Sequence, residues 1–266
     1  MKRYIIILLA IPIVLQSCSS MYIPATRSIP LFEKKGEFQA EAGISTNSIY
    51  ANSSYAFTDN FAASINGNLS YGNFSNRYDL FTHKKDEPPS DLWWPDTRGD
   101  FSHRYAEVSV GKINMLPTFP MRLEVFGGIG MGRATDIDHF NNDNRYKTDY
   151  YAFFGQGNFG FKKQLFEAGI SIRLAYSYFN YTANIYSRDL YQREFGVIHA
   201  EPMLFARVGT ERLKFVYRLG VNLALTMDPT EEYTGYNEYR GLHDQGKLSH
   251  TIFHISIGMS YRIGGK

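Results

Sequence analysis

The sequence predicts an all-β protein, an antiparallel up-and-down transmembrane β-barrel of about ten strands. Apolar and polar residues alternate over long stretches, which places them on opposite faces of a strand. Most of these stretches exceed the roughly five or six residues that are usual in soluble sheets. Short turns and long polar loops also alternate along the chain, as expected when successive connections lie at opposite ends of a barrel.

The C-terminal stretches show the alternation best. Apolar side chains occupy every second position from Phe253 to Ile263 and again from Leu213 to Leu225, with Arg218 among the residues of the opposite face. The same pattern predicts strands at 36–45, 48–58, 60–72, 103–113, 120–133, 149–162, 165–178, 195–209, 212–225 and 250–263.

The connections between these strands fall into two classes. Tight turns are predicted near Thr58-Asp59-Asn60, Leu116-Pro117-Thr118, Lys163-Gln164 and Thr210-Glu211. Long polar loops are predicted at 73–102, 134–148, 179–194 and 226–249, and only the first hairpin, near Thr46-Asn47, is short on the long-loop side. Because the number of strands is even, both chain ends should emerge where the tight turns lie, which in outer-membrane barrels is the periplasmic end.

The N-terminus has the form of a secretory signal, with Lys2 and Arg3 before an apolar run from Tyr4 to Leu15. That run is too short to span a bilayer, which takes about 20 apolar residues. Its removal would leave 26 basic and 26 acidic residues, so no basic field exists to attract nucleic acid.

The stretch Leu15-Gln16-Ser17-Cys18 resembles the lipobox of bacterial lipoproteins, in which the cysteine thiol receives a diacylglyceryl group. Cys18 is the only cysteine, so it has no partner for a disulfide. The alternative is an ordinary signal peptide that happens to contain a cysteine. We therefore expect a signal peptide at 1–17, a lipidated tether at 18–35 and a barrel at 36–266. We expect no cofactor besides the lipid on Cys18.

The residues that follow, Met21-Tyr22-Ile23-Pro24 and Ile29 to Glu37, are similar to those of uncharacterised outer-membrane β-barrel lipoproteins of Bacteroidota. This resemblance covers the whole chain and implies an outer-membrane location, but it carries no known activity. Ser19 and Ser20 stand where an acidic surface-export signal would follow Cys18, so we expect the lipid on the periplasmic side. Outer-membrane lipid and another outer-membrane protein complex are the expected partners.

The face opposite the apolar one carries charge, and in a barrel of this size it points into a narrow interior. The charged residues expected there are Glu41, Glu107, Arg122, Glu124, Glu167, Arg173, Glu201, Arg207, Arg218 and Arg262. Lys214, His199 and His254 share this face. Unpaired charges would be costly, so we expect Arg–carboxylate pairs that plug the barrel. The alternative is that they form the constriction of a selective pore.

Other motifs give weaker signals. The adjacent Trp93 and Trp94 either bind a partner or glycan or fold over the end of the barrel. The stretch Asp136 to Asn144 is rich in oxygen ligands but lacks the glycine of a calcium loop, so no metal site is expected. We read the glycine-rich stretch 127–132 as small residues in a crowded interior.

Three functions remain open on these grounds. The first is a structural or accessory barrel that binds partners through its outer loops, and the second is a narrow porin or transport channel. The third is a barrel enzyme, a protease or a lipid-modifying protein. Because the acidic residues and histidines do not match the pattern of omptin-like barrel proteases, we expect no catalytic residues.

Overall fold

The computed structural model describes residues 20–45, 48–73, 99–113, 121–138, 144–185, 188–226, 249–250 and 253–264. These residues form strands β1 (Ser20–Tyr22), β2 (Phe38–Ser45), β3 (Ile49–Ala56), β4 (Phe61–Asn73), β5 (Gly99–Lys112), β6 (Met121–Asp138), β7 (Asn144–Lys162), β8 (Phe166–Ile185), β9 (Arg188–Gly209), β10 (Leu213–Val221), β11 (Leu223–Ala224), β12 (Ser249–His250) and β13 (Phe253–Ile263). Within this part of the chain, no helix is long and apolar enough to cross a bilayer.

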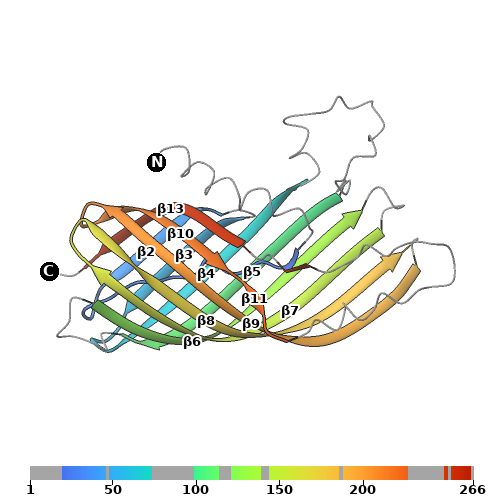
Figure 1. The fold of residues 1–266 in the computed structure, drawn as a ribbon, viewed down its shortest axis with the longest axis horizontal. Coiled ribbons are helices and arrows are strands. Elements are labelled where there is room, and N and C mark those ends of the chain that lie inside the picture. Colours follow the sequence, from blue (N-terminus) through green and yellow to red (C-terminus); the bar gives the residue numbers. More distant parts are fainter. Residues whose placement is uncertain are drawn as a thin grey trace, which may run out of the picture.

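All strands except β1 and β12 belong to one antiparallel sheet that closes on itself (Figure 1). Strands that follow one another in sequence pair with one another, and β13 closes the barrel by pairing with both β10 and β2. Strands β10 and β11 count as one, because both pair with β9 and only Asn222 separates them. The protein is therefore a closed antiparallel barrel of ten strands, as the alternation predicted.

The described tight turns lie at one end of the barrel, on the left in Figure 1, and we call it the tight-turn end. In the turns after β3 and β9, the hydroxyl groups of Thr58 and Thr210 accept hydrogen bonds from the backbone N–H groups of Phe61 and Leu213. Threonine therefore stabilises each turn through its side chain. The turn predicted near Leu116 lies outside the described residues. We call the other end the long-loop end.

The long loops predicted at 134–148 and 179–194 are largely wrong. Strand β6 continues to Asp138, β7 starts at Asn144, and β8 and β9 together cover all but residues 186 and 187 of the second region. Backbone hydrogen bonds pair two strands whatever the polarity of their side chains, so a polar hairpin can extend a sheet. The predicted loops 73–102 and 226–249 lie almost entirely outside the described residues.

The two faces of the wall follow the predicted alternation. On β10, Leu219 is 43% exposed on the outer face, whereas Arg218 is fully buried on the inner face. Aromatic side chains, which form interfacial girdles in outer-membrane barrels, are exposed on the outer face at Phe61, Tyr151, Tyr176, Tyr178 and Tyr217. Phe161 is partly exposed there.

Residues 22–33, which belong to the expected tether at 18–35, run through the interior of the barrel. We call them the luminal segment. Phe32 packs with Ala56 and Ala62, which border the tight turn after β3. At the other end, Ser20 and Tyr22 pair in parallel with Ser249 and His250 of β12, just before β13. The luminal segment therefore crosses from the tight-turn end to the long-loop end and forms part of the core.

Candidate functional site

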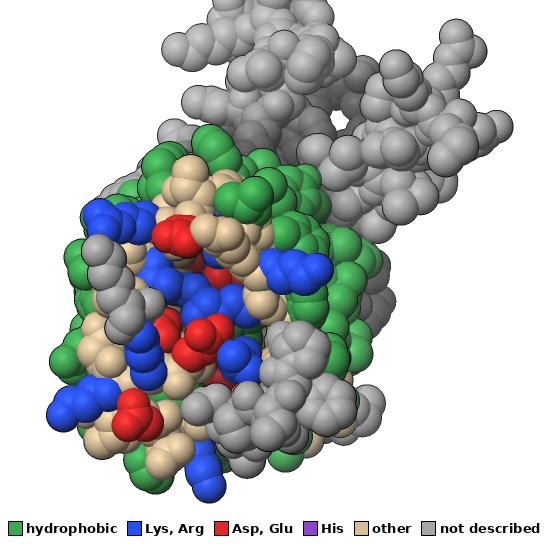
Figure 2. Space-filling view, turned by 90° about the vertical axis from the view of Figure 1, so that its left-hand side faces the viewer, with side chains coloured by type: hydrophobic (Ala, Val, Ile, Leu, Met, Phe, Trp, Pro, Cys, Tyr) green, Lys and Arg blue, Asp and Glu red, His purple; other side chains and the backbone are tan. Residues whose placement is uncertain are grey.

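The interior of the barrel is the candidate functional site, because it contains nearly all of the buried charge. Figure 2 looks into the tight-turn end, where basic and acidic side chains fill the centre and apolar side chains cover the outer wall. Most of the ten charged residues predicted to face inward are buried, and Arg122 and Arg262 are partly buried.

The largest cluster of charged side chains includes contacts between strands that do not pair with each other in the sheet. Glu167 of β8 accepts hydrogen bonds from Arg207 at 3.0 Å, from Lys214 at 2.7 Å and from Arg262 at 2.8 Å. Arg207 also reaches Glu41 of β2 at 3.4 Å, and Arg218 pairs with the same carboxylate. These contacts tie β8, β9, β10, β13 and β2 together across the interior.

A second pair crosses the lumen between β5 and β8. The two terminal nitrogens of Arg173 donate to the two carboxylate oxygens of Glu107 at 2.8 and 2.7 Å. Both side chains are at most 1% exposed, and Glu107 also accepts hydrogen bonds from Asn66 and Tyr105. This bidentate geometry is the strongest form of charged hydrogen bond between side chains.

Glu201 was expected to pair with an arginine of the wall, but its partners lie on the luminal segment. Tyr22 donates to one carboxylate oxygen at 2.6 Å, and Arg27 contacts the other at 3.4 Å. Arg27 also donates to the backbone carbonyl of Glu201 at 2.6 Å. Because Tyr22, Arg27 and Glu201 are almost fully buried, these contacts fix the segment to β9.

The remaining two predicted residues, Glu124 and Arg122, also contact this N-terminal part of the chain. Glu124 accepts a hydrogen bond from the backbone N–H of Phe32 at 2.8 Å. Arg122 pairs with Glu33 at 3.2 Å, and Lys162 lies 3.5 Å from the same carboxylate. Burial opposes ionisation of Glu33, but Lys162 and Arg122 outweigh it and hold the pKa of this carboxyl below its ordinary value of 4.5.

The barrel wall also recognises the backbone of the luminal segment. Arg262 donates to the carbonyl of Pro30 at 2.6 Å, Gln156 to that of Ser28 at 2.9 Å, and Lys162 to that of Leu31 at 3.2 Å. An extended segment without a partner strand leaves its carbonyl groups free, and burying them unpaired would be costly. The inward-pointing donors of the wall therefore bind backbone carbonyl groups of the luminal segment as well as carboxylates of the wall.

Apolar contacts hold the luminal segment along its length. Ile29 and Leu31 pack against Met203 and Phe205 of β9. Leu31 has a φ of +50°, a left-handed backbone conformation that is uncommon for a residue with a side chain. Its side chain is fully buried, so packing compensates for the local backbone strain.

Aromatic side chains fill the interior toward the long-loop end. The ring of Tyr22 stacks on His199 with centroids 4.2 Å apart and meets Tyr150 edge to face at 5.6 Å. Tyr105 stacks on Tyr150 at 5.8 Å. Inward glycines of β6 make room for these rings, because a Cβ atom at Gly130 would collide with Tyr105 and one at Gly132 with Tyr150. The glycine-rich stretch thus serves packing.

Several sequence-predicted residues lie outside the described part of the chain. They are Cys18, Trp93 and Trp94, together with residues 139–143 of the oxygen-rich stretch. Among the described residues, no group of three histidine, cysteine, aspartate or glutamate side chains is arranged to hold a metal ion.

Sequence reasoning missed Tyr22, Arg27 and Phe32 as parts of the site. One signal pointed to them: the stretch from Tyr22 to Phe32 contains only one charged residue, Arg27, and several large apolar ones. A solvated tether is usually polar and poor in such residues. The two prolines and the absence of a periodic hydrophobic pattern indicated a tether instead. A segment that is packed on all sides shows neither the strand nor the helix period, so its pattern does not distinguish it from a tether.

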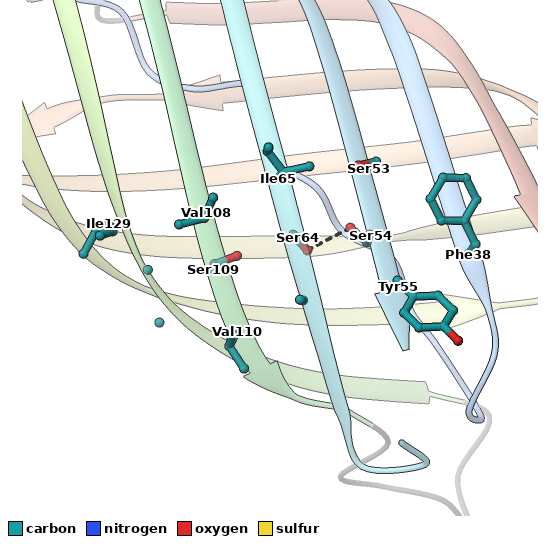
Figure 3. Close-up of a pocket in the computed structure, with 13 residues that line it drawn as sticks. Phe38, Ser53, Ser54, Tyr55, Ser64, Ile65, Val108, Ser109, Val110 and Ile129 are labelled. Atoms are coloured by element: carbon teal, nitrogen blue, oxygen red, sulfur yellow. Dashed lines mark hydrogen bonds between the residues drawn. The ribbon is translucent and has the colours of Figure 1, made fainter. Parts of the chain in front are cut away.

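A shallow hollow on the outer face lies apart from this site (Figure 3). The side chains of Tyr55, Ile65, Val108 and Ile129 surround small residues such as Ala63. Ser54 and Ser64, which hydrogen-bond at 2.8 Å, lie on the inner side of the same wall. The hollow is open and apolar, and it brings no group of charged residues together.

No family model matches this sequence, and no curated protein matches it either. The chemistry of the interior is therefore the basis for a functional assignment. In this interior, charged side chains of the wall pair with one another and with the chain's own luminal segment.

Proposed function

We propose that this chain is an outer-membrane β-barrel of Bacteroidota type with a lipid on Cys18 and a closed lumen. In this proposal its role is structural or accessory: it binds lipid and another outer-membrane protein complex, and it catalyses no reaction. The observation that carries the proposal is the luminal segment, which occupies the interior and is held by charged and backbone hydrogen bonds at both ends.

The outer face supports a location in the membrane. Large apolar side chains are exposed on it from strand to strand, with Phe215 67% exposed, Met131 62% and Phe153 57%. Soluble monomers rarely expose apolar patches larger than a few hundred Å². A closed barrel leaves no unpaired strand edge, which makes the fold compatible with hydrocarbon.

The extended hairpins support an accessory role outside the membrane. Toward the long-loop end, the outward side chains become polar, and Arg133 and Lys147 both pair with Asp149. Such residues belong in water or among headgroups rather than in hydrocarbon. Strands β6 to β9 therefore provide a rigid, polar platform beyond the apolar band, on which a partner can bind.

Current recordings in planar bilayers test the closed lumen. We expect no steady unitary current from the parent protein, because charge pairs and the luminal segment fill the interior. The variant Arg27→Ala should show brief openings, whereas Arg104→Ala, an exposed arginine on the outer face, should behave like the parent. A large, stable and ion-selective conductance of the parent would favour a narrow porin or transport channel instead.

Gentle detergent extraction from native outer membrane tests the accessory role. We expect the parent to migrate as a defined complex on native gels. The double variant Trp93→Ala, Trp94→Ala should shift to the size of the barrel alone if the loop 73–102 binds the partner. Migration of the parent as a single barrel after mild cross-linking would contradict this part of the proposal.

A further inference from the structure

The direction of the luminal segment determines at which end of the barrel the N-terminal part of the chain emerges. Phe32 lies among residues that border the tight-turn end, namely Ala56, Ala62 and Ile113. Ile23 instead packs on Ala134 of β6, near the long-loop end. The segment between them makes wall contacts at Arg27 and Ser28. The chain therefore crosses the whole interior without turning back.

The length of the segment agrees with this path. From Tyr22 to Phe32 the chain makes ten residue steps, which in extended form span at most about 33–36 Å. The hydrocarbon core of a bilayer is about 30 Å thick. An extended luminal segment is therefore long enough to cross one membrane thickness.

The place where the segment leaves the barrel is set by strand pairing. Ser20 pairs with Ser249, and Tyr22 with His250, directly before β13 begins at Phe253. In β13, Phe253 is paired with Val221, at the end of β10 that lies away from the tight turn near Thr210. In the sequence, Cys18 precedes Ser20 by two residues, and two residue steps span at most about 7 Å.

We propose that the chain is threaded through its own barrel, so that its lipidated N-terminus emerges at the cell surface and the lipid on Cys18 enters the outer leaflet. This inference rests on the proposed function, in which the extended hairpins at the long-loop end lie on the outer side of the membrane. It reverses the expected periplasmic anchor. That expectation counted strands and assumed that the residues before β2 stay at the end where β2 begins, whereas the luminal segment carries them to the opposite end.

Two side chains allow a direct test of the threading. The hydroxyl oxygens of Ser28 on the segment and Ser54 on β3 are 2.6 Å apart in the interior. Replacing both with cysteine should therefore allow a disulfide, which mass spectrometry detects as a joined peptide pair from protein in isolated outer membranes. The matched control is Ser28→Cys with Ser53→Cys, since residue 53 points to the outer face next to Ser54 and should not be linked. Equal linkage in both variants, or none in either, would place the segment outside the lumen.

Epitope tags on intact cells test the sidedness. One tag is inserted between Ser19 and Ser20, and a second into the tight turn between Lys163 and Gln164 of otherwise unchanged chains. We expect the N-terminal tag to bind antibody equally before and after permeabilisation, and the turn tag to bind only afterwards. An N-terminal tag that also needs permeabilisation would overturn the inference and leave the proposed barrel intact. A turn tag that is accessible on intact cells would overturn the barrel orientation, and a chain absent from the outer-membrane fraction would overturn the proposed function itself.

Discussion

The buried pair between Arg173 and Glu107 should be a main determinant of stability. Replacing Arg173 with Met removes two ionic hydrogen bonds of 2.7 and 2.8 Å and leaves the carboxylate buried with only neutral donors, Asn66 and Tyr105. Breaking a buried pair in this way costs about 3–5 kcal/mol. The exposed Lys35 provides the control, because Lys35→Ala should change the unfolding free energy by no more than about 0.5 kcal/mol.

Equilibrium unfolding in urea, followed by circular dichroism in phospholipid vesicles, measures these free energies. The single variants Arg173→Met and Glu107→Gln should each be strongly destabilised, and the double variant should cost less than their sum. The difference, a coupling energy of about 1–3 kcal/mol, isolates the pair from the cavity left by shortening the side chain. Additive effects of the two substitutions would refute the reasoning, because they would show that the two groups do not interact across the lumen.

Three further outcomes follow from the outer face, the packed glycines and the tight-turn end. Leu219→Arg should cost about 2–4 kcal/mol and abolish heat-resistant migration in gels, whereas Leu219→Phe should be nearly neutral, because this side chain faces lipid in the proposed orientation. Gly132→Ala should lose about 1–3 kcal/mol in urea unfolding through overpacking against Tyr150, whereas Gly127→Ala, whose added carbon meets no atom closer than 3.9 Å, should not. Because its pKa is lowered in the folded state, Glu33 stabilises the protein above the unfolded pKa, and this contribution is lost as the pH falls through the folded value. Thermal unfolding between pH 7 and 3 should therefore be less pH-dependent in Glu33→Gln, and an unchanged acid limb would contradict the role of this carboxylate.

The barrel wall could be predicted from the sequence because alternation is a local property. A residue such as Arg218 faces inward whenever its neighbour Leu219 faces outward, so one strand is enough to assign both faces. The ends of β6 to β9 could not be found in this way. Their outer residues become polar beyond the apolar band, and a paired polar strand has the same composition as a loop.

The contacts inside the barrel depend on partners that are distant in sequence. Tyr22 and Glu201 are 179 positions apart, and nothing local to either residue indicates the other. Alternation correctly places Glu201 on the inner face. In a narrow lumen, however, an inward side chain can contact residues of several strands, so alternation does not identify its partner. The choice between a wall arginine and the luminal segment therefore depends on the three-dimensional path of residues 22–33, whose irregular pattern does not reveal that path.

The luminal segment also constrains the order in which the molecule can assemble. It directly precedes β2, and the pairing of β2 with β13, the last strand, completes the barrel. Once this seam is formed, an interior occupied by Arg173, Arg207 and their partners leaves no passage for a chain end that carries the proposed diacylglyceryl group. The segment must therefore lie on the concave face of the open sheet before the first and last strands meet. Variants that weaken its contacts, such as Arg27→Ala, should then slow insertion into the membrane in addition to lowering the stability of the finished protein.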